Sequence, residues 1–149
     1  MKFYVWAGYA LTGFAITLPL AVANAQPAVA TDSAVFVERT ESGNMRSLEP
    51  ANRLSRGDRV VTIVNWYRMG GDGGFTITNP LPHAIAYQGS ARDDQEVSVD
   101  GGRTWGQLGT LRIAGRLASP EDVTHMRWRI PANSAQRGQG RIAYSGIVR

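Results

Sequence analysis

The chain of 149 residues contains no cysteine, which excludes disulfide bridges and thiolate chemistry, so its stability must come from packing. It has two histidines, His83 and His125, which are not at a spacing that binds zinc, and it has no Gly-x-Ser-x-Gly turn to carry a nucleophile. Basic residues exceed acidic residues by only 16 to 12, without a basic block. From these absences we expect neither an enzyme with catalytic residues nor a protein that binds nucleic acid.

A long apolar run lies at the N-terminus. Residues 1–25 have Lys2 as their single charge, an apolar centre and a small-x-small ending at Ala25. This pattern is typical of a secretory signal peptide that is cleaved between Ala25 and Gln26. An uncleaved membrane anchor is the alternative, but Pro19 and the lack of a charged stop after the run argue against it. We therefore expect an exported protein, periplasmic, at the cell surface or extracellular, with no membrane span after cleavage.

Cleavage would leave 124 residues, enough for one domain with its own hydrophobic core. Residues 26–33 are small and polar and predict a flexible leader, so that residues 34–149 form the domain. Within it, apolar and polar residues alternate, turn residues recur and no amphipathic helix is indicated. This pattern predicts an all-β fold, an antiparallel β-sandwich of about seven or eight strands, with a small barrel as the alternative. The expected strands are residues 34–40, 59–67, 75–78, 84–89, 96–99, 108–113, 123–130 and 141–148.

Two of these strands carry strong patterns. Residues 59–67 are largely apolar on both alternating faces, as expected for a central strand. The glycine-rich segment 70–74 then predicts a hairpin into the next strand. Residues 123–130 alternate strictly, which places Met126 and Trp128 on a face that we expect to be buried.

The other face of residues 123–130 carries His125, Arg127 and Arg129. Together with Arg141 these side chains could form a basic stripe that attracts acidic polysaccharide or lipid headgroups. A solvated strand face is the alternative.

Three segments follow one another in a characteristic order: Leu54-x-x-Gly57-Asp58-Arg59-Val60, Thr78–Pro82 and Tyr87–Ala91. In this order they resemble the conserved-repeat domain of unknown function eleven (DUF-eleven), a secreted and surface module. The similarity runs from about Glu49 to Arg149, and Val35–Arg39 is typical of a short single-domain branch. The resemblance implies an immunoglobulin-like sandwich and a non-catalytic module of cell-envelope proteins, with no catalytic residues to carry over.

The long strand departs from that family pattern at two positions. Thr62 stands where the family usually has an aromatic residue, and Arg68 stands where it usually has an asparagine. A buried threonine leaves volume that a neighbouring side chain can fill. We expect Trp66 or Trp128, both predicted core residues, to fill it.

Residues 98–105 match the Asp-box pattern of sialidases, Ser-x-Asp-x-Gly-x-Thr-Trp, at every fixed position. In Asp-box proteins the motif closes a β-hairpin, with the aspartate in the turn and the tryptophan packed beneath it, and it usually recurs once per propeller blade. One copy in a domain of this size cannot form a propeller. The motif therefore predicts a hairpin with Asp100 in its turn rather than a carbohydrate-processing site.

Four carboxylates lie within eight residues, and hard oxygen ligands at this density can hold calcium. These candidate ligands are Asp93, Asp94, Glu96 and Asp100. Their spacing does not match an EF-hand loop, and a solvated acidic loop is the alternative. Calcium is the only cofactor that the sequence suggests.

These features favour a non-catalytic exported structural or interaction module of the cell envelope, whose partner is an envelope protein, the chain itself or polysaccharide. Two alternatives stay open. The first is a self-assembling fibre or pilus-like subunit in which residues 26–37 or the C-terminal strand complete a neighbour's sheet by strand exchange. The second is a carbohydrate- or calcium-dependent binding domain, suggested by the acidic loop and the aromatic side chains.

Overall fold

The computed structural model describes residues 28–41 and 45–149. The predicted signal peptide and its cleavage site between Ala25 and Gln26 lie outside these residues. Within the two described ranges, no helix is long and apolar enough to cross a membrane. Most of the described chain forms antiparallel strands, so the prediction of an all-β fold is confirmed.

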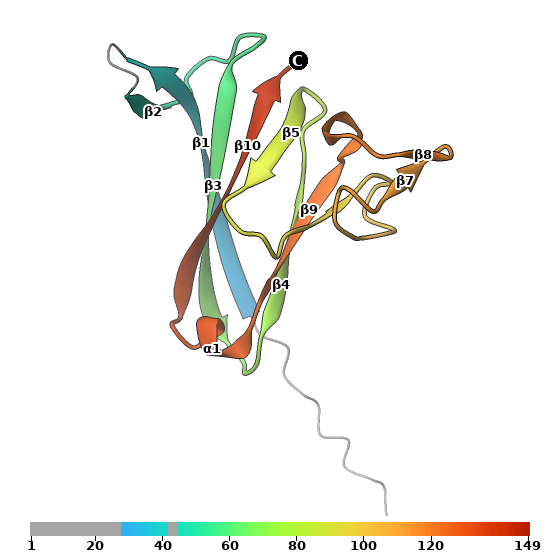
Figure 1. Ribbon diagram of the computed structural model, residues 1–149. Coiled ribbons are helices and arrows are strands. Elements are labelled where there is room, and N and C mark those ends of the chain that lie inside the picture. Colours follow the sequence, from blue (N-terminus) through green and yellow to red (C-terminus); the bar gives the residue numbers. More distant parts are fainter. Residues whose placement is uncertain (1–27, 42–44) are drawn as a thin grey trace, which may run out of the picture.

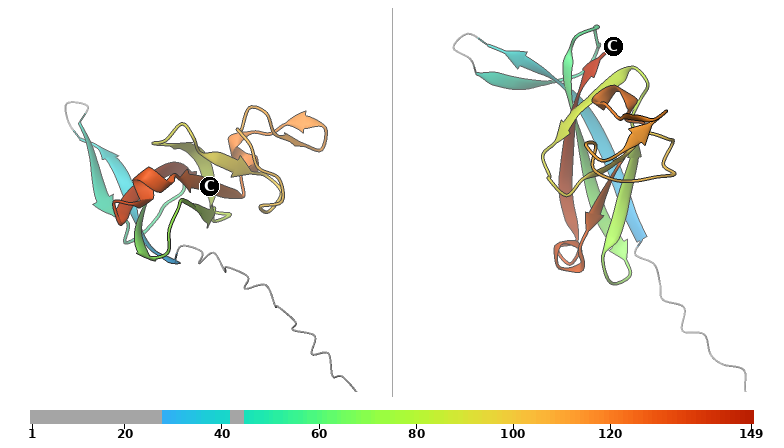
Figure 2. Two further views of the ribbon diagram at one scale, coloured as in Figure 1. Left: turned by 90° about the horizontal axis from the view of Figure 1, so that it is seen from below. Right: turned by 45° about the vertical axis from the view of Figure 1, so that its right-hand side comes forward.

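The strands are β1 (Ala28–Thr40), β2 (Arg46–Pro50), β3 (Arg59–Gly70), β4 (Phe75–Pro80), β5 (Ile85–Ser90), β6 (Glu96–Ser98), β7 (Arg112–Ile113), β8 (Arg116–Leu117), β9 (His125–Ile130) and β10 (Gln139–Val148). Among the described residues, the helical elements are a 3-10 helix (Pro120–Asp122) and α1 (Ala132–Ala135). One antiparallel sheet has five strands in the order β2-β1-β3-β10-β5, and a second has three in the order β4-β9-β6 (Figure 1). The small β7-β8 hairpin projects to the side (Figure 2).

The first strand is longer than the sequence pattern indicates. We expected residues 26–33 to form a flexible leader and the domain to begin at Ala34, but β1 begins at Ala28 and pairs with β3 as far as Val37. The side chains of this segment are small and polar, so they do not indicate a strand. Its main chain nevertheless pairs with the long strand β3 through hydrogen bonds. The prediction of a flexible leader is therefore wrong for residues 28–33.

The glycine-rich segment 70–74 connects the two sheets instead of closing a hairpin. β3 belongs to the five-stranded sheet and β4 pairs with β9 in the other, so the predicted hairpin is wrong. The segment passes close to the end of β9, where a Cβ added to Gly74 would lie 2.5 Å from the main-chain oxygen of Ile130. Only glycine permits two main chains to approach so closely. Glycine in this segment therefore allows the chain to cross from one sheet to the other close to β9.

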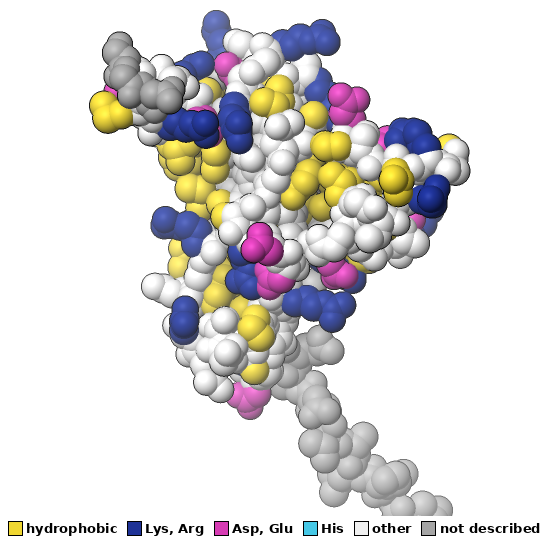
Figure 3. Space-filling view, in the orientation of Figure 1, with side chains coloured by type: hydrophobic (Ala, Val, Ile, Leu, Met, Phe, Trp, Pro, Cys, Tyr) yellow, Lys and Arg dark blue, Asp and Glu magenta, His cyan; other side chains and the backbone are white. Residues whose placement is uncertain are grey.

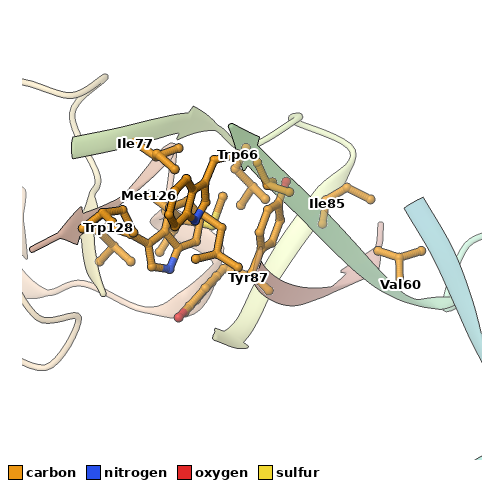
Figure 4. Close-up of a cluster of buried hydrophobic side chains, with 14 of the residues drawn as sticks. Val60, Trp66, Ile77, Ile85, Tyr87, Met126 and Trp128 are labelled. Atoms are coloured by element: carbon orange, nitrogen blue, oxygen red, sulfur yellow. The ribbon is translucent and has the colours of Figure 1, made fainter. Parts of the chain in front are cut away.

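The core lies between the sheets and uses the faces that the alternation predicts (Figure 4). Met126 and Trp128 on β9 are fully buried, and Trp66 on β3 is 4% exposed, which confirms these three as core residues. The rings of Trp66 and Phe75 meet edge-on with centroids 5.2 Å apart. Trp128 packs against Tyr144 with centroids 5.9 Å apart. Aromatic contacts between strands of different sheets thus hold the two sheets together.

Loops replace the strand that we expected at residues 108–113. Within that range only Arg112–Ile113 is a strand, and it pairs with β8 across a turn in which Ala114 has a φ of 48°. A positive φ is uncommon for a residue other than glycine, so the local sequence did not indicate this turn.

Candidate functional site

The Asp-box motif at residues 98–105 closes a hairpin, as the sequence predicts. Val97 and Gly106 on its two arms exchange main-chain hydrogen bonds of 2.9 and 3.1 Å. The indole N–H of Trp105 donates to the main-chain oxygen of Gly102 at 2.9 Å, so the ring lies against the turn. The motif therefore forms the turn of the hairpin that follows β6, and its role is structural.

The carboxylate of Asp100 is the acceptor around which this turn is built. It accepts hydrogen bonds from the hydroxyls of Thr104 (2.6 Å) and Ser98 (2.8 Å), and from the main-chain N–H groups of Thr104 and Arg103. These bonds, above all the one from the Thr104 hydroxyl, hold the pKa of Asp100 well below its usual range because they favour the charged form. Four hydrogen bonds from within the turn thus occupy this carboxylate, which leaves it a structural role.

Replacing Asp100 by asparagine is expected to lower the thermal midpoint at pH 7 by roughly 5 °C, because an amide NH2 would face groups that donate. The lowered pKa means that the folded protein binds this proton less tightly than the unfolded chain. The stabilisation from Asp100 is therefore complete above its ordinary pKa of 3.8 and is lost as the pH falls further. Thermal unfolding at pH 7 and pH 3 measures both effects, and the variant should lose less stability than the wild type between them.

Asp93→Asn is the matched control, because Asp93 is exposed and lies outside the turn. We expect its midpoint to equal that of the wild type at pH 7. An Asp100→Asn protein that unfolds at the wild-type temperature would contradict the structural role of the motif.

The other three acidic candidates do not converge on a common point. Asp94 pairs with Arg92 at 2.5 Å, and Glu96 pairs with Arg127 at 2.7 Å. Hydrogen bonds from these arginines lower the pKa of both carboxyls. Asp93 is exposed. In the part of the chain that the structure describes, no group of three or more His, Asp or Glu side chains is placed to hold a metal ion.

Of the four basic side chains that could form a stripe, three lie at alternate positions of β9, and the structure places Arg141 on β10. Arg127 pairs with Glu96, and its guanidinium carbon lies 4.6 Å from the centre of the Trp105 ring. Arg129 also lies near Glu96, at 3.6 Å, whereas Arg141 belongs to β10 in the other sheet. The two arginines of β9 thus share one acidic neighbour, which offsets part of their charge.

An apolar groove with a cavity volume of about 350 Å³ opens between the two sheets, beside β1 and β4. Its floor is made by side chains from β3, β5, β10 and the segment after β4. Five buried residues form this floor: Val60, Thr62, Leu81, Ile85 and Tyr144. The groove was not predicted from the sequence, because its floor comes from four separate segments.

The short side chain of Thr62 is the one sequence signal that bears on the groove. We expected Trp66 or Trp128 to fill the volume beside Thr62, but these rings pack against Phe75 and Tyr144. Thr62 instead lines the open groove. Thr62 is therefore part of a concave surface between the sheets.

The rim of the groove combines exposed apolar side chains with fixed polar groups. Val35 is 39% exposed and Leu54 is 42% exposed. Elsewhere on the lining, the side-chain amide of Asn79 donates a hydrogen bond of 2.9 Å to the hydroxyl of Tyr144. Apolar walls with a few oriented polar groups are typical of sites that bind ligands or peptides.

The two strands beside the groove have free edges within the described residues. Residues 28–34 of β1 pair in the sheet with β3 alone, and β4 pairs with β9 alone. A free edge presents main-chain N–H and C=O groups to which another extended chain can bond. The groove and the edges together can therefore accommodate an extended segment. Comparisons of this chain with known protein families, with curated proteins and with solved structures found no match.

Proposed function

We propose that the chain is a non-catalytic exported module of the cell envelope with an immunoglobulin-like fold, and that its groove binds an extended segment of another envelope protein. The observation that carries this proposal is the groove, an apolar surface flanked by the free edges of β1 and β4. A segment that pairs with β1 would direct alternate side chains into the groove. The signal-peptide pattern of residues 1–25 and the resemblance to DUF-eleven support the envelope location.

The chemistry of the groove defines the segment that it would bind. Its floor is apolar apart from the hydroxyls of Thr62 and Tyr144, which favours aliphatic residues at alternate positions of the partner. The amide of Asn79 lies on the lining, where its oxygen can accept a hydrogen bond from the partner's main chain. The volume of about 350 Å³ suits a few such side chains and lies at the lower end of pockets that bind small molecules.

The two alternative functions gain less support. The segments that a fibre subunit would donate, β1 and β10, both lie in the chain's own sheet, and β10 sits between β3 and β5. Their donation would break existing pairings on both sides of β10. For a calcium-dependent lectin, the four candidate carboxylates would have to move, because three of them are bonded to separate partners.

A photo-reactive amino acid at Leu54, introduced in cells that express the full gene, tests the proposal. We expect a cross-linked adduct with a different protein in the envelope fraction, and a chain in that fraction that begins at Gln26. The same amino acid at Met69, which is exposed near the far end of β3, is the matched control and should give no such adduct. The proposal is contradicted by the absence of an adduct, by an adduct between two copies alone, or by a cytosolic chain that retains residues 1–25.

Filling the groove is expected to abolish binding while the fold is retained. Thr62→Leu adds apolar volume to the floor of the groove. We expect its thermal midpoint to lie within about 4 °C of the wild-type value. We expect the yield of the adduct at Leu54 to fall about tenfold or more. Thr76→Leu adds the same group at an exposed position of β4 and should leave the yield unchanged. A folded Thr62→Leu protein that cross-links as the wild type does would exclude the groove as the binding site.

A further inference from the structure

The outer face of the five-stranded sheet carries an apolar band. Alternate residues of β1, β3 and β10 point away from the core and meet in two neighbouring cross-strand rows. The band consists of Ala34, Phe36, Val61, Ile63 and Ala143, none of which is fully buried. Over these strands, hydrophobic side chains lie among arginine side chains (Figure 3).

Within the described residues, the band has no second layer over it. The three-stranded sheet packs on the opposite face of the five-stranded sheet (Figure 2). On that face the buried residues Val60, Val64 and Trp66 alternate with the band residues along β3. β3 is therefore apolar on both faces, a pattern expected for a strand that is covered on both sides. In the described chain only one of these faces is covered, so the pattern indicates a partner on the other.

A polar row borders the band and places opposite charges on the two sides of β3. Asp32 on β1, Asn65 on β3 and Arg141 on β10 lie directly opposite one another. The amide of Asn65 donates to Asp32 at 2.8 Å, and the guanidinium of Arg141 donates to Asn65 at 3.2 Å. Both charged residues are exposed, and each lies one strand away from β3.

We propose that a second copy of this chain packs on this face in a two-fold symmetric dimer whose axis runs along β3. Such an axis exchanges the positions of β1 and β10, so that Asp32 of each copy lies over Arg141 of the other. Ile63 then lies near its own counterpart, and Ala34 lies over Ala143. The face is thus complementary to itself in both charge and hydrophobicity.

The composition and size of the face suit an interface. The basic residue of the polar row is an arginine, Arg141, and Tyr67, beside that row, is 38% exposed. Protein interfaces favour arginine and tyrosine over lysine. From strand spacing and length, the five strands present about 700 Å². This area is close to the about 800 Å² that each partner buries in a stable complex.

Analytical ultracentrifugation of the exported protein, purified from cells that express the full gene, tests this proposal. We expect an equilibrium between monomer and dimer without larger species, because a two-fold interface is closed. Ile63→Lys places like charges at the axis and is expected to weaken dimerisation at least about 30-fold, as for a central interface residue. Leu117→Lys, an exposed position on the β7-β8 hairpin outside the five-stranded sheet, is the control and should dimerise as the wild type does.

Charge reversal supplies an independent test that keeps the fold of the band intact. Asp32→Arg and Arg141→Asp should each weaken the dimer, and the double variant should restore it, because opposite charges then face each other again. A wild-type chain that stays monomeric up to about 0.1 mM, a dimer insensitive to Ile63→Lys, open polymers, or absence of rescue would overturn the proposal. These variants leave the groove lining unchanged, so their failure would not affect the proposed function.

Discussion

Replacing Trp128 by alanine is expected to lower the free energy of unfolding by about 3–5 kcal/mol, the cost of removing a buried aromatic side chain. Trp128 is 0% exposed and packs between the sheets against Tyr144. Its indole N–H also donates to the hydroxyl of Ser90 at 3.2 Å. A domain of this size is stable by only about 5–15 kcal/mol, so the variant should unfold at a much lower urea concentration.

Two further variants show how much of this loss of stability depends on the size of the side chain and how much on its buried position. Trp128→Phe keeps a ring in the core and loses the hydrogen bond to Ser90, so its cost should lie below that of alanine. Leu117, which is 55% exposed, should change stability by no more than about 0.5 kcal/mol when it is replaced by alanine. Equal urea midpoints for Trp128→Ala and Leu117→Ala would show that the aromatic contact does not hold the sheets together.

Gly140→Ala is expected to destabilise the protein by about 1–3 kcal/mol, although it adds only one methyl group. Gly140 lies directly opposite Trp66, and the indole ring covers the glycine main chain. An added Cβ would lie 2.5 Å from Cε2 and 2.8 Å from Nε1 of that ring, closer than these atoms can pack. Because Trp66 is buried and contacts Phe75, the ring can move only by disturbing the core.

Gly89→Ala is the matched control, a glycine within β5 whose added Cβ would meet no atom within 4 Å. We expect it to leave stability unchanged or to raise it slightly, because alanine reduces the freedom of the unfolded chain. Urea unfolding of both variants measures the difference. If Gly140→Ala were as stable as Gly89→Ala, the close approach of Trp66 would have no energetic role.

Local patterns predicted the parts of the molecule whose partners are close in the sequence. Asp100 finds its hydrogen-bond donors between Ser98 and Thr104, so eight residues sufficed to predict the turn. The burial of Met126 and Trp128 followed from the alternation along one strand, because successive side chains of a strand point to opposite faces. In β3 both alternating sets of side chains are largely apolar, and this pattern supports the proposed dimer face.

The groove and the polar row could not be predicted in this way. Thr62, Leu81 and Tyr144 meet in the groove from distant segments, and Asp32 meets Arg141 across a strand that neither belongs to. The carboxylates that are neighbours in the sequence took separate partners, as Glu96 did with Arg127. Nearness along the chain was therefore a poor guide to nearness in space for charged side chains.

By itself, the sequence determined the strand-rich character of this protein, the inward faces of its main strands and the closed Asp-box turn, because each depends on residues a few positions apart. The tertiary structure alone decided that residues 28–33 belong to β1, that the glycines at 70–74 carry the chain between sheets, and that an apolar groove lies open beside Thr62. The alternation of apolar and polar residues shows which face of a strand is apolar, but it does not show which strand lies beside it. Strands pair through main-chain N–H and C=O groups, and these groups are the same in almost every residue. The choice of neighbours is made by packing across the whole core, and the candidate binding surfaces follow from that choice.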